Sequence, residues 1–292
     1  MKPATFEYVR AKSLDEACKY LATNQNALIL AGGQSLIPML SMRLARPSLL
    51  IDIAHIKGID KLEKRDQTIS IGAMVRQKDA LSNLLVKKYL PLLIKGLMNV
   101  GHAPTRARGT IGGSIAQAAP SSEIALVAVT LGASIKVKDK NEDITFPANE
   151  FFLGPLLTLN SETGCIYEID FPIPSTKKHG SGFRETSQRN SDYALASAAV
   201  QIESNVKNEI SKINLAIGGV SDYPQLLNFE NYWNGEKSIN SIKAAILDAI
   251  NEIEFVSDFH GSSEYRKRAV IQLAYFSFID ALQEIGLLSH ES

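Results

Sequence analysis

Apolar and polar residues alternate along the first part of the chain with the two periods that distinguish helices from strands. Ser13 and Glu16 have the spacing of a capping box, in which each side chain satisfies a backbone N–H. The apolar positions behind them predict a helix that ends near Asn24. Short apolar or alternating runs predict strands at residues 27–30, 49–53 and 68–72. The N-terminal part is therefore expected to mix α and β elements.

The middle of the chain has a denser apolar pattern. Leucines recur at near-helical spacing over residues 76–99, and Pro91 interrupts them, which predicts two short helices with proline opening the second. Residues 109–114 are predicted to form a glycine-rich loop, and small polar residues precede an apolar helix over 124–131 that leads into a strand. No apolar run reaches the roughly 20 residues that span a bilayer, so membrane insertion is not expected.

The remaining sequence predicts a separate C-terminal unit. Proline, polar and glycine residues at 175–182 are predicted to form a linker. Beyond it, the pattern predicts three antiparallel strands within 183–218 and amphipathic helices at 238–253 and 262–286. The expected fold class is α+β, with a C-terminal antiparallel sheet and helices. The predicted domains are 1–176, with subdomains of about 1–55 and 56–176, and 181–292.

The composition argues against several classes of function. Lys plus Arg total 31 and Asp plus Glu total 31, and this zero formal net charge gives no electrostatic basis for binding nucleic acid or an anionic membrane. Cys18 and Cys165 stand apart from any cluster of cysteines or histidines, so no disulfide framework, zinc site or iron–sulfur site is indicated. The N-terminal residues lack the apolar run of a secretion signal, and a reducing cytoplasm is the expected compartment.

Two segments carry the candidate chemistry, and each places a serine after a glycine pair. We call Ala31-Gly32-Gly33-Gln34-Ser35 the first glycine segment and Thr110-Ile111-Gly112-Gly113-Ser114 the second glycine segment. Converging N–H groups can hold a diphosphate without any lysine, and glycine permits the close approach and positive φ that such a cradle needs. The side-chain hydroxyls can add hydrogen bonds. Each segment alone also fits an ordinary hairpin turn, so the residues by themselves indicate no more than a double glycine-loop anion site.

Other motifs for cofactor binding or hydrolysis are missing from the sequence. There is no G-x-G-x-x-G of a Rossmann dinucleotide site, no G-x-S-x-G and no H-E-x-x-H. The five histidines are scattered along the chain, so neither a catalytic triad nor a zinc centre is predicted.

The residues around both segments resemble the flavin subunits of the xanthine dehydrogenase and aerobic carbon monoxide dehydrogenase family of molybdenum hydroxylases. Residues 30–38 are similar to the first FAD-binding loop of that family, and residues 106–114 are similar to its second. The resemblance covers nearly the whole chain, because further similar segments occur in the expected order at residues 6–10, 50–53, 71–74, 183–185, 191–195 and 261–266. Collinear matches of this kind favour flavin binding over two unrelated hairpins.

The resemblance implies a two-subdomain FAD-binding module of the PCMH type, like that of vanillyl-alcohol oxidase, with a C-terminal domain closing over the flavin ring. Both glycine segments would then hold the diphosphate. Glu123 stands where the family has an aspartate near the adenosine ribose, and Tyr193 matches a position beside the isoalloxazine. Ile166 would be an apolar neighbour of the ring, and Arg106 is expected to brace the second glycine segment.

Three positions depart from the family pattern. Ser114 replaces a frequent asparagine, Gln117 a histidine or asparagine, and Ala119 an aspartate. A serine hydroxyl can still donate to phosphate, whereas the missing acid at Ala119 leaves the polar contacts at that end of the site open. A tyrosine simply packed in a strand is the alternative for Tyr193.

The function implied by the resemblance is electron transfer through FAD, from a partner's 2Fe-2S cluster to an external acceptor. The chain would need a 2Fe-2S small subunit and a molybdopterin-binding large subunit, because two cysteines cannot ligate a cluster of its own. No catalytic residue and no metal ligand is expected within it. Two alternatives stay open, a self-contained FAD-dependent oxidoreductase with its own organic substrate and a cofactor-free assembly protein on the same fold.

Overall fold

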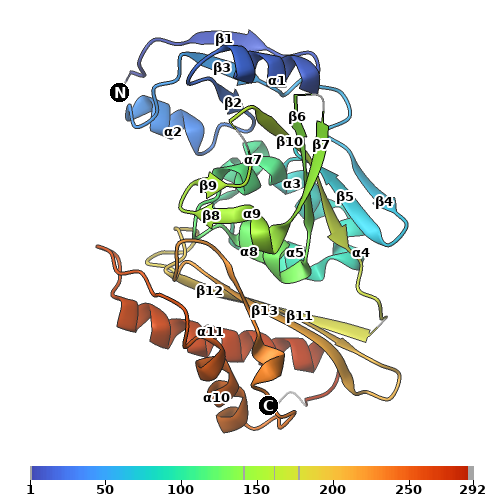
Figure 1. Ribbon diagram of the computed structural model, residues 1–292. Helices are drawn as coiled ribbons and strands as arrows, with labels where there is room; N and C mark the ends of the chain where they lie inside the picture. Colours follow the sequence, from blue (N-terminus) through green and yellow to red (C-terminus); the bar gives the residue numbers. More distant parts are fainter. Residues whose placement is uncertain (1, 141, 161, 177, 289–292) are drawn as a thin grey trace.

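Three β-sheets follow one another along the chain and are stacked in that order (Figure 1). The computed structural model describes residues 2–140, 142–160, 162–176 and 178–288. Within these ranges the sheets have three, five and four strands, and a separate two-stranded hairpin lies beside the second sheet. Helices and strands occur largely in separate runs, and antiparallel pairing predominates, so the predicted α+β class is confirmed.

The first sheet is parallel and has the order β1-β3-β2. The first helix, α1, begins at the predicted capping box, where Ser13 Oγ accepts from the Glu16 N–H at 3.1 Å and Glu16 accepts from the Lys12 N–H at 2.6 Å. Ala17 and Cys18 on α1 pack under this sheet. The elements are β1 (Glu7–Arg10), α1 (Leu14–Thr23), β2 (Leu28–Leu30), α2 (Leu36–Ser41) and β3 (Leu49–Asp52).

The second sheet is antiparallel and has the order β4-β5-β10-β6-β7. Its strands are β4 (Leu62–Arg65), β5 (Thr68–Gly72), β6 (Ser134–Asp139), β7 (Glu142–Pro147) and β10 (Gly164–Pro172). Seven helices and the hairpin surround it in the described residues: α3 (Gln77–Ser82), α4 (Leu84–Tyr89), α5 (Pro91–Asn99), α6 (Ala103–Arg108), α7 (Ile111–Gln117), α8 (Glu123–Leu131), α9 (Ala148–Phe151), β8 (Phe152–Gly154) and β9 (Leu157–Thr158). The predicted apolar helix is α8, and it is buried in the largest core from its second residue onward.

Two predictions for this region are wrong. Residues 76–99 form three helices rather than two, because Asn83 ends α3 and starts α4 by accepting from the Leu85 N–H at 2.8 Å. The predicted loop at 109–114 is largely helical, since α7 begins at Ile111. Thr110 caps this helix through Oγ1, which accepts from the Gly113 N–H at 3.0 Å.

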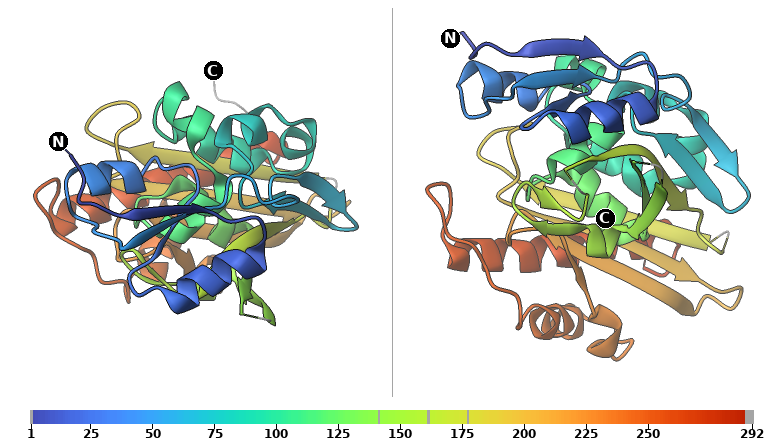
Figure 2. Two further views of the ribbon diagram at one scale, coloured as in Figure 1. Left: turned by 90° about the horizontal axis from the view of Figure 1, so that it is seen from above. Right: turned by 45° about the horizontal axis from the view of Figure 1, so that its top comes forward.

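The third sheet is antiparallel, and two helices cover the face that points away from the rest of the molecule (Figures 1 and 2). Its elements are β11 (Lys178–Thr186), β12 (Ala196–Ser204), β13 (Ile210–Gly218), β14 (Gln225–Leu227), the 3-10 helix η1 (Phe229–Asn231), α10 (Ile239–Ala249) and α11 (Ser263–Glu284). The three predicted strands and both predicted helices are present. The sequence pattern missed β14, a strand of three residues at the sheet edge.

The predicted linker at 175–182 is wrong in its second half, which belongs to β11. Its glycines allow close packing rather than flexibility. A Cβ at Gly182 would lie 2.5 Å from the Ser277 carbonyl carbon, and a Cβ at Gly180 would lie 3.0 Å from the Ala281 carbonyl carbon. Both glycines therefore let α11 lie directly on the strand.

The third sheet shares an apolar core with the second through α8. Phe183, Ala199 and Ala216, from β11, β12 and β13, belong to the same core as α8. The interface between α8 and this sheet, which we call the seam, is therefore part of the main core. The proposed boundaries at 1–176 and 181–292 stay predictions, and residues 289–292 lie outside the described residues. No described helix is long and apolar enough to cross a membrane.

Candidate functional site

The first glycine segment forms the turn between β2 and α2. Gly33 adopts a φ of +73°, a left-handed conformation that side chains disfavour. Its carbonyl oxygen accepts from the Ile37 N–H at 3.0 Å, which leads the chain into α2. Within the described part of the chain, the N–H groups of residues 32–35 donate to no protein acceptor. These donors are therefore available to an anion.

The second glycine segment uses its backbone differently, because each N–H of residues 111–114 donates within the protein. The acceptors are Val75 O at 3.0 Å, Ala73 O at 2.9 Å, Thr110 Oγ1 at 3.0 Å and Thr110 O at 3.2 Å. Ser114 Oγ accepts from Gln77 Nε2 at 2.9 Å, which leaves its own proton free to donate. Thr110 is buried and a Cβ at Gly112 would collide with Ala73, so this segment can offer a ligand only the Ser114 hydroxyl and the bare surface at Gly113.

The structure brings the two glycine segments into contact. A Cβ at Gly113 would lie 3.7 Å from the Ala31 Cβ, at ordinary contact distance. A Cβ at Gly32 would overlap the Arg108 carbonyl oxygen and lie 3.0 Å from the Gly109 Cα. Gly32 therefore lets the first glycine segment rest on the backbone that leads into the second, which joins the first and second sheets at this point.

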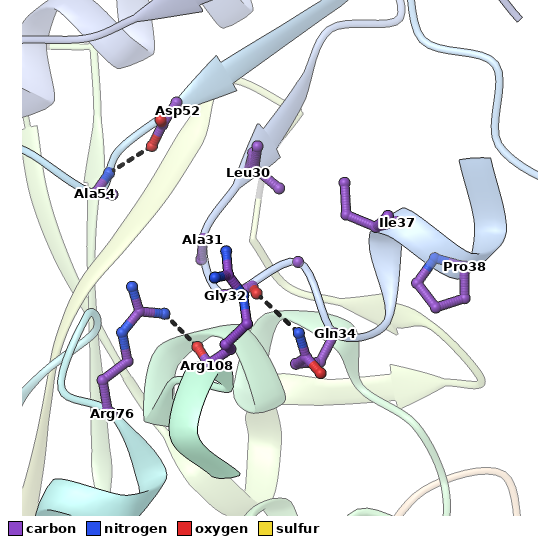
Figure 3. A pocket seen from close by; sticks show the side chains of 11 residues that line it. Leu30, Ala31, Gly32, Gln34, Ile37, Pro38, Asp52, Ala54, Arg76 and Arg108 are labelled. Carbon is purple, nitrogen blue, oxygen red and sulfur yellow. Dashed lines mark hydrogen bonds between the residues drawn. The ribbon is translucent and has the colours of Figure 1, made fainter. Parts of the chain in front are cut away.

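A cavity of about 430 Å³ opens beside the first glycine segment (Figure 3). Figure 3 shows the Arg76 and Arg108 side chains extending from the region of α3 and α6 toward this segment, and Arg76 Nη1 donates to the Arg108 carbonyl oxygen. The cavity lies within the usual size range of small-molecule sites. Its lining is Leu30, Ala31, Gly32, Gly33, Gln34, Ile37, Pro38, Asp52, Ala54, Arg76 and Arg108.

Asp52 is the acidic residue in the cavity wall, and its charge is already compensated. It ends β3, is 8% exposed, accepts from the Tyr8 hydroxyl and the Ala54 N–H, and pairs with Arg10 at 3.5 Å. Burial by itself would raise the pKa of Asp52, but these hydrogen bonds and the Arg10 charge outweigh it and lower the pKa below its ordinary value. The Asp52 carboxylate therefore does not neutralise the positive charge of the two guanidinium groups across the cavity.

Sequence reasoning missed Arg76, Arg108 and Asp52. Arg106 was expected to brace the second glycine segment, and it does hold the preceding turn, donating to Val100 O at 2.8 Å and Gly101 O at 2.6 Å. Its neighbour Arg108 carries the charge that reaches the cavity. Asp52 could have been found from its place at the carboxyl end of a parallel strand, where ligands commonly bind.

The other predicted site residues do not line this cavity. Ser35 precedes α2 and its side chain makes no capping hydrogen bond, and Ile166 is 5% exposed beside a bulge in β10. Tyr193 is 78% exposed in the connection between β11 and β12, so it is not the alternative tyrosine packed in a strand. Their predicted contacts with a cofactor stay predictions.

Glu123 and Glu185 form a second group of titratable residues, at the seam. Glu123 opens α8, and Glu185 lies two residues beyond Phe183 on the same face of β11, where its Oε2 is buried without a hydrogen-bond partner in the described residues. Burial raises the pKa of Glu123 to about 7. Burial, with a smaller effect of the nearby Glu123 charge, raises the pKa of Glu185 to about 8. The seam is thus weakly acidic, in contrast to the cationic cavity.

The residues around the cavity fit the diphosphate of a dinucleotide cofactor. Unpaired N–H groups at residues 32–35 and two guanidinium groups favour a compact anion over a neutral ligand. A Cβ at Gly33 would meet the Ile37 side chain at 3.0 Å, so the turn is already filled on that side. A ligand would therefore approach from the cavity.

Comparison with known proteins agrees with this chemistry. A family model described as the FAD binding domain in molybdopterin dehydrogenase matches residues 4–174, and one described as the CO dehydrogenase flavoprotein C-terminal domain matches residues 181–281. The glyceraldehyde dehydrogenase medium chain of Sulfolobus acidocaldarius is 36% identical over 95% of this chain and 99% of its own length. The nicotine 6-hydroxylase medium subunit of Paenarthrobacter nicotinovorans is 32% identical over 96% of this chain and 99% of its own length.

Solved structures show the same fold. Carbon monoxide dehydrogenase from Hydrogenophaga pseudoflava includes a chain that superposes with a TM-score of 0.93 at 30% identity, covering 97% of this chain and 99% of that one. This chain belongs to the family of FAD-binding subunits of molybdenum hydroxylases. The resemblance inferred from its sequence is confirmed, FAD is the family's cofactor, and the chain is an oxidoreductase subunit of the xanthine and carbon monoxide dehydrogenase type.

Proposed function

We propose that this chain is the medium subunit of a molybdenum hydroxylase complex in which its FAD takes electrons from a partner's 2Fe-2S cluster and passes them to an external acceptor. The observation that carries the proposal is the cavity at the first glycine segment, which is lined by residues with unpaired N–H groups and by two arginines. Bound FAD supplies the redox chemistry, and the protein holds the cofactor and sets its surroundings.

Different residues of this chain would contact different parts of the cofactor. The first glycine segment would donate N–H groups to the diphosphate, and the second would allow close approach at Gly113 and donate from Ser114 Oγ. Glu123 near the ribose, and Ile166 and Tyr193 beside the ring, complete the proposed contacts. The high exposure of Tyr193 suits a side chain that would be covered only by a ligand or a partner subunit.

The small number of cysteines in this chain supports the proposal that partner subunits carry the other redox centres. Its two cysteines are too few for a 2Fe-2S cluster, which supports a separate 2Fe-2S small subunit and a molybdopterin-binding large subunit. Three of the relatives are named as the medium subunit of a hydroxylase or the medium chain of a dehydrogenase. Cys18 and Cys165 are free and buried, and burial raises the pKa of Cys165 to about 12, so this thiol stays protonated. Free thiols agree with the cytoplasmic location that we propose.

The visible spectrum of the purified chain tests cofactor binding, and FAD released by denaturation should approach one per chain. Stopped-flow spectra then test the route of electrons. The isolated chain should react slowly with aldehydes, purines and other carbon substrates, whereas the assembled complex should bleach the flavin when its substrate is added. Rapid bleaching of the isolated chain by a carbon substrate would instead identify a self-contained oxidoreductase. A folded chain that binds no flavin would identify the cofactor-free assembly protein.

A further inference from the structure

Two arginines outside the glycine segments face the cavity without a counterion. Arg76 precedes α3 and Arg108 ends α6, so they come from different elements and are 32 positions apart. Neither guanidinium forms an ion pair with any carboxylate in the described residues. Unpaired guanidinium groups that face one space are a common arrangement for binding phosphate.

The position of these arginines relative to the first glycine segment is fixed by backbone packing. Gly32 rests against the Arg108 carbonyl oxygen, and Arg76 Nη1 donates to that same oxygen. The Arg108 side chain makes no hydrogen bond in the described residues, so its guanidinium has all its donors available. An anion held by the N–H groups of residues 32–35 would thus lie next to two positive charges.

We infer that Arg76 and Arg108 form a clamp of two guanidinium groups that neutralises the diphosphate of a nucleotide at the first glycine segment. A nucleoside diphosphate carries charge that backbone N–H groups stabilise but do not neutralise. Neither glycine segment contains a lysine or arginine, so any positive side-chain charge at this site comes from residues outside both segments. The clamp supplies this positive charge. The ADP portion of the cofactor is therefore the part that this cavity would recognise.

This inference rests on the proposed function, because it assumes that the nucleotide in the cavity is part of the cofactor. It also divides the tasks of the two arginines. Arg76 both supplies charge and ties the backbone at Arg108, whereas Arg108 supplies charge alone. Replacing Arg108 should therefore weaken binding without disturbing the fold, and Arg76→Lys should retain part of the affinity that Arg76→Gln loses.

The test is calorimetric titration of the flavin-free full chain with ADP and with adenosine, at low and high salt. Arg108→Gln and Arg76→Gln should each weaken ADP binding about 10- to 100-fold, the effect of losing one charge-assisted contact, and should leave adenosine binding unchanged. ADP affinity of the wild type should fall with salt more steeply than that of either variant. Arg268→Gln, an exposed position on α11, is the matched control and should behave like the wild type.

Three outcomes distinguish a failure of the arginine clamp from a failure of the proposed function. Flavin-free variants that bind ADP as tightly as the wild type, and that still take up FAD when it is added, overturn the clamp and leave the proposed function standing. Equal losses for ADP and adenosine also overturn it, because they indicate a distorted site rather than lost charge. A wild-type chain that binds neither FAD nor ADP overturns both.

Discussion

Among the residues that the structure describes, the N–H groups of residues 32–35 in the first glycine segment have no protein acceptor and lie beside a cationic cavity. The second glycine segment uses the N–H groups of residues 111–114 within the protein and leads toward an acidic seam. Both contain a glycine pair followed by a serine. The difference arises from their neighbours. The second segment lies against residues 73–75, whose carbonyl groups accept two of its N–H bonds, while the turn after β2 has no such partner. Similar sequence patterns therefore produce one turn with unpaired N–H groups and one packing helix.

The glycines themselves serve different needs in the two segments. Gly33 is required for its conformation, since its φ is positive. Gly112 is required for space, because a Cβ there would lie 2.6 Å from the Ala73 Cα and 2.8 Å from the Ala73 carbonyl oxygen. At Gly113, a Cβ would meet the Thr110 hydroxyl oxygen at 2.7 Å but would lie at an ordinary contact distance of 3.7 Å from the Ala31 Cβ. Substitutions at the three positions should therefore have three different effects: backbone strain at Gly33, a steric clash in the core at Gly112, and a blocked approach to the first glycine segment at Gly113.

The largest effect is expected for Gly112→Val. Its side chain would collide with the backbone of Ala73, which cannot move without disturbing β5, so the free energy of unfolding should fall by more than about 3 kcal/mol. Soluble yield and urea unfolding measure this. A Gly112→Val chain that unfolds at the wild-type urea concentration would show that the second glycine segment is not the packing element described here.

Gly113→Val should keep the fold and lose the flavin. Its Cβ would meet Thr110 Oγ1 at 2.7 Å, so the capping hydroxyl must shift, at a cost of about 1 kcal/mol. The branched side chain would also close the approach to the first glycine segment. The flavin-to-protein absorbance ratio should drop to near zero, while Ala116→Val, at an exposed position of the same helix, should retain flavin. Full flavin content in folded Gly113→Val would remove this segment from the site.

Much of the architecture could be predicted from the sequence because local patterns determine it. The capping box at Ser13, the strand at Thr68–Gly72 and the helix α8 follow from spacing alone. The helical start of α7 could not be predicted, since it depends on carbonyl groups of residues 73–75 that only the tertiary fold brings near. The glycines at 180 and 182 were misinterpreted for the same reason, because α11 packs on them from about 100 residues away.

The site was predictable in part. Glycine pairs predict an anion-binding segment by local chemistry, and the family resemblance identifies the cofactor. Arg76 and Arg108 could not be recognised, because a lone arginine before or at the end of a short helix is common and only the fold places both beside Ala31 and Gly32. Glu185 was missed similarly, as an acid in a strand is unremarkable until it faces a buried seam.

A smaller effect should separate conformation from ligand contact in the first glycine segment. Gly33→Ala must adopt a positive φ and should lose about 1–2 kcal/mol of stability. Gly58→Ala is the matched control, because Gly58 has a φ of +92° and a Cβ there would meet nothing within 4 Å. Thermal unfolding with and without added FAD measures both effects. Both variants should be destabilised, and only Gly33→Ala should lose stabilisation by FAD; equal stabilisation of both would assign Gly33 a purely structural role.

The last prediction concerns the seam, which is the acidic side of the comparison. The pKa values of Glu123 and Glu185 are raised from an ordinary 4.5 to about 7 and about 8, so the folded chain keeps protons that the unfolded chain releases. Because the folded state binds more protons, this contribution to stability is fully present below about pH 4.5 and declines as pH rises to about 8. Above that pH it should change no further.

Urea midpoints measured between pH 5 and pH 9 test this dependence and show whether the seam differs from the rest of the surface. Glu185→Gln removes the group with the higher pKa and should flatten the decline, most clearly between about pH 7 and pH 8, whereas Glu252→Gln at an exposed position should reproduce the wild-type curve. Glu123→Gln should additionally lower the pKa of Glu185, because the Glu123 charge contributes to raising it. A wild-type curve that rises through this range would mean that both carboxylates are ionised and stabilised in the fold, and the contrast between a cationic cavity and a proton-holding seam would have to be abandoned.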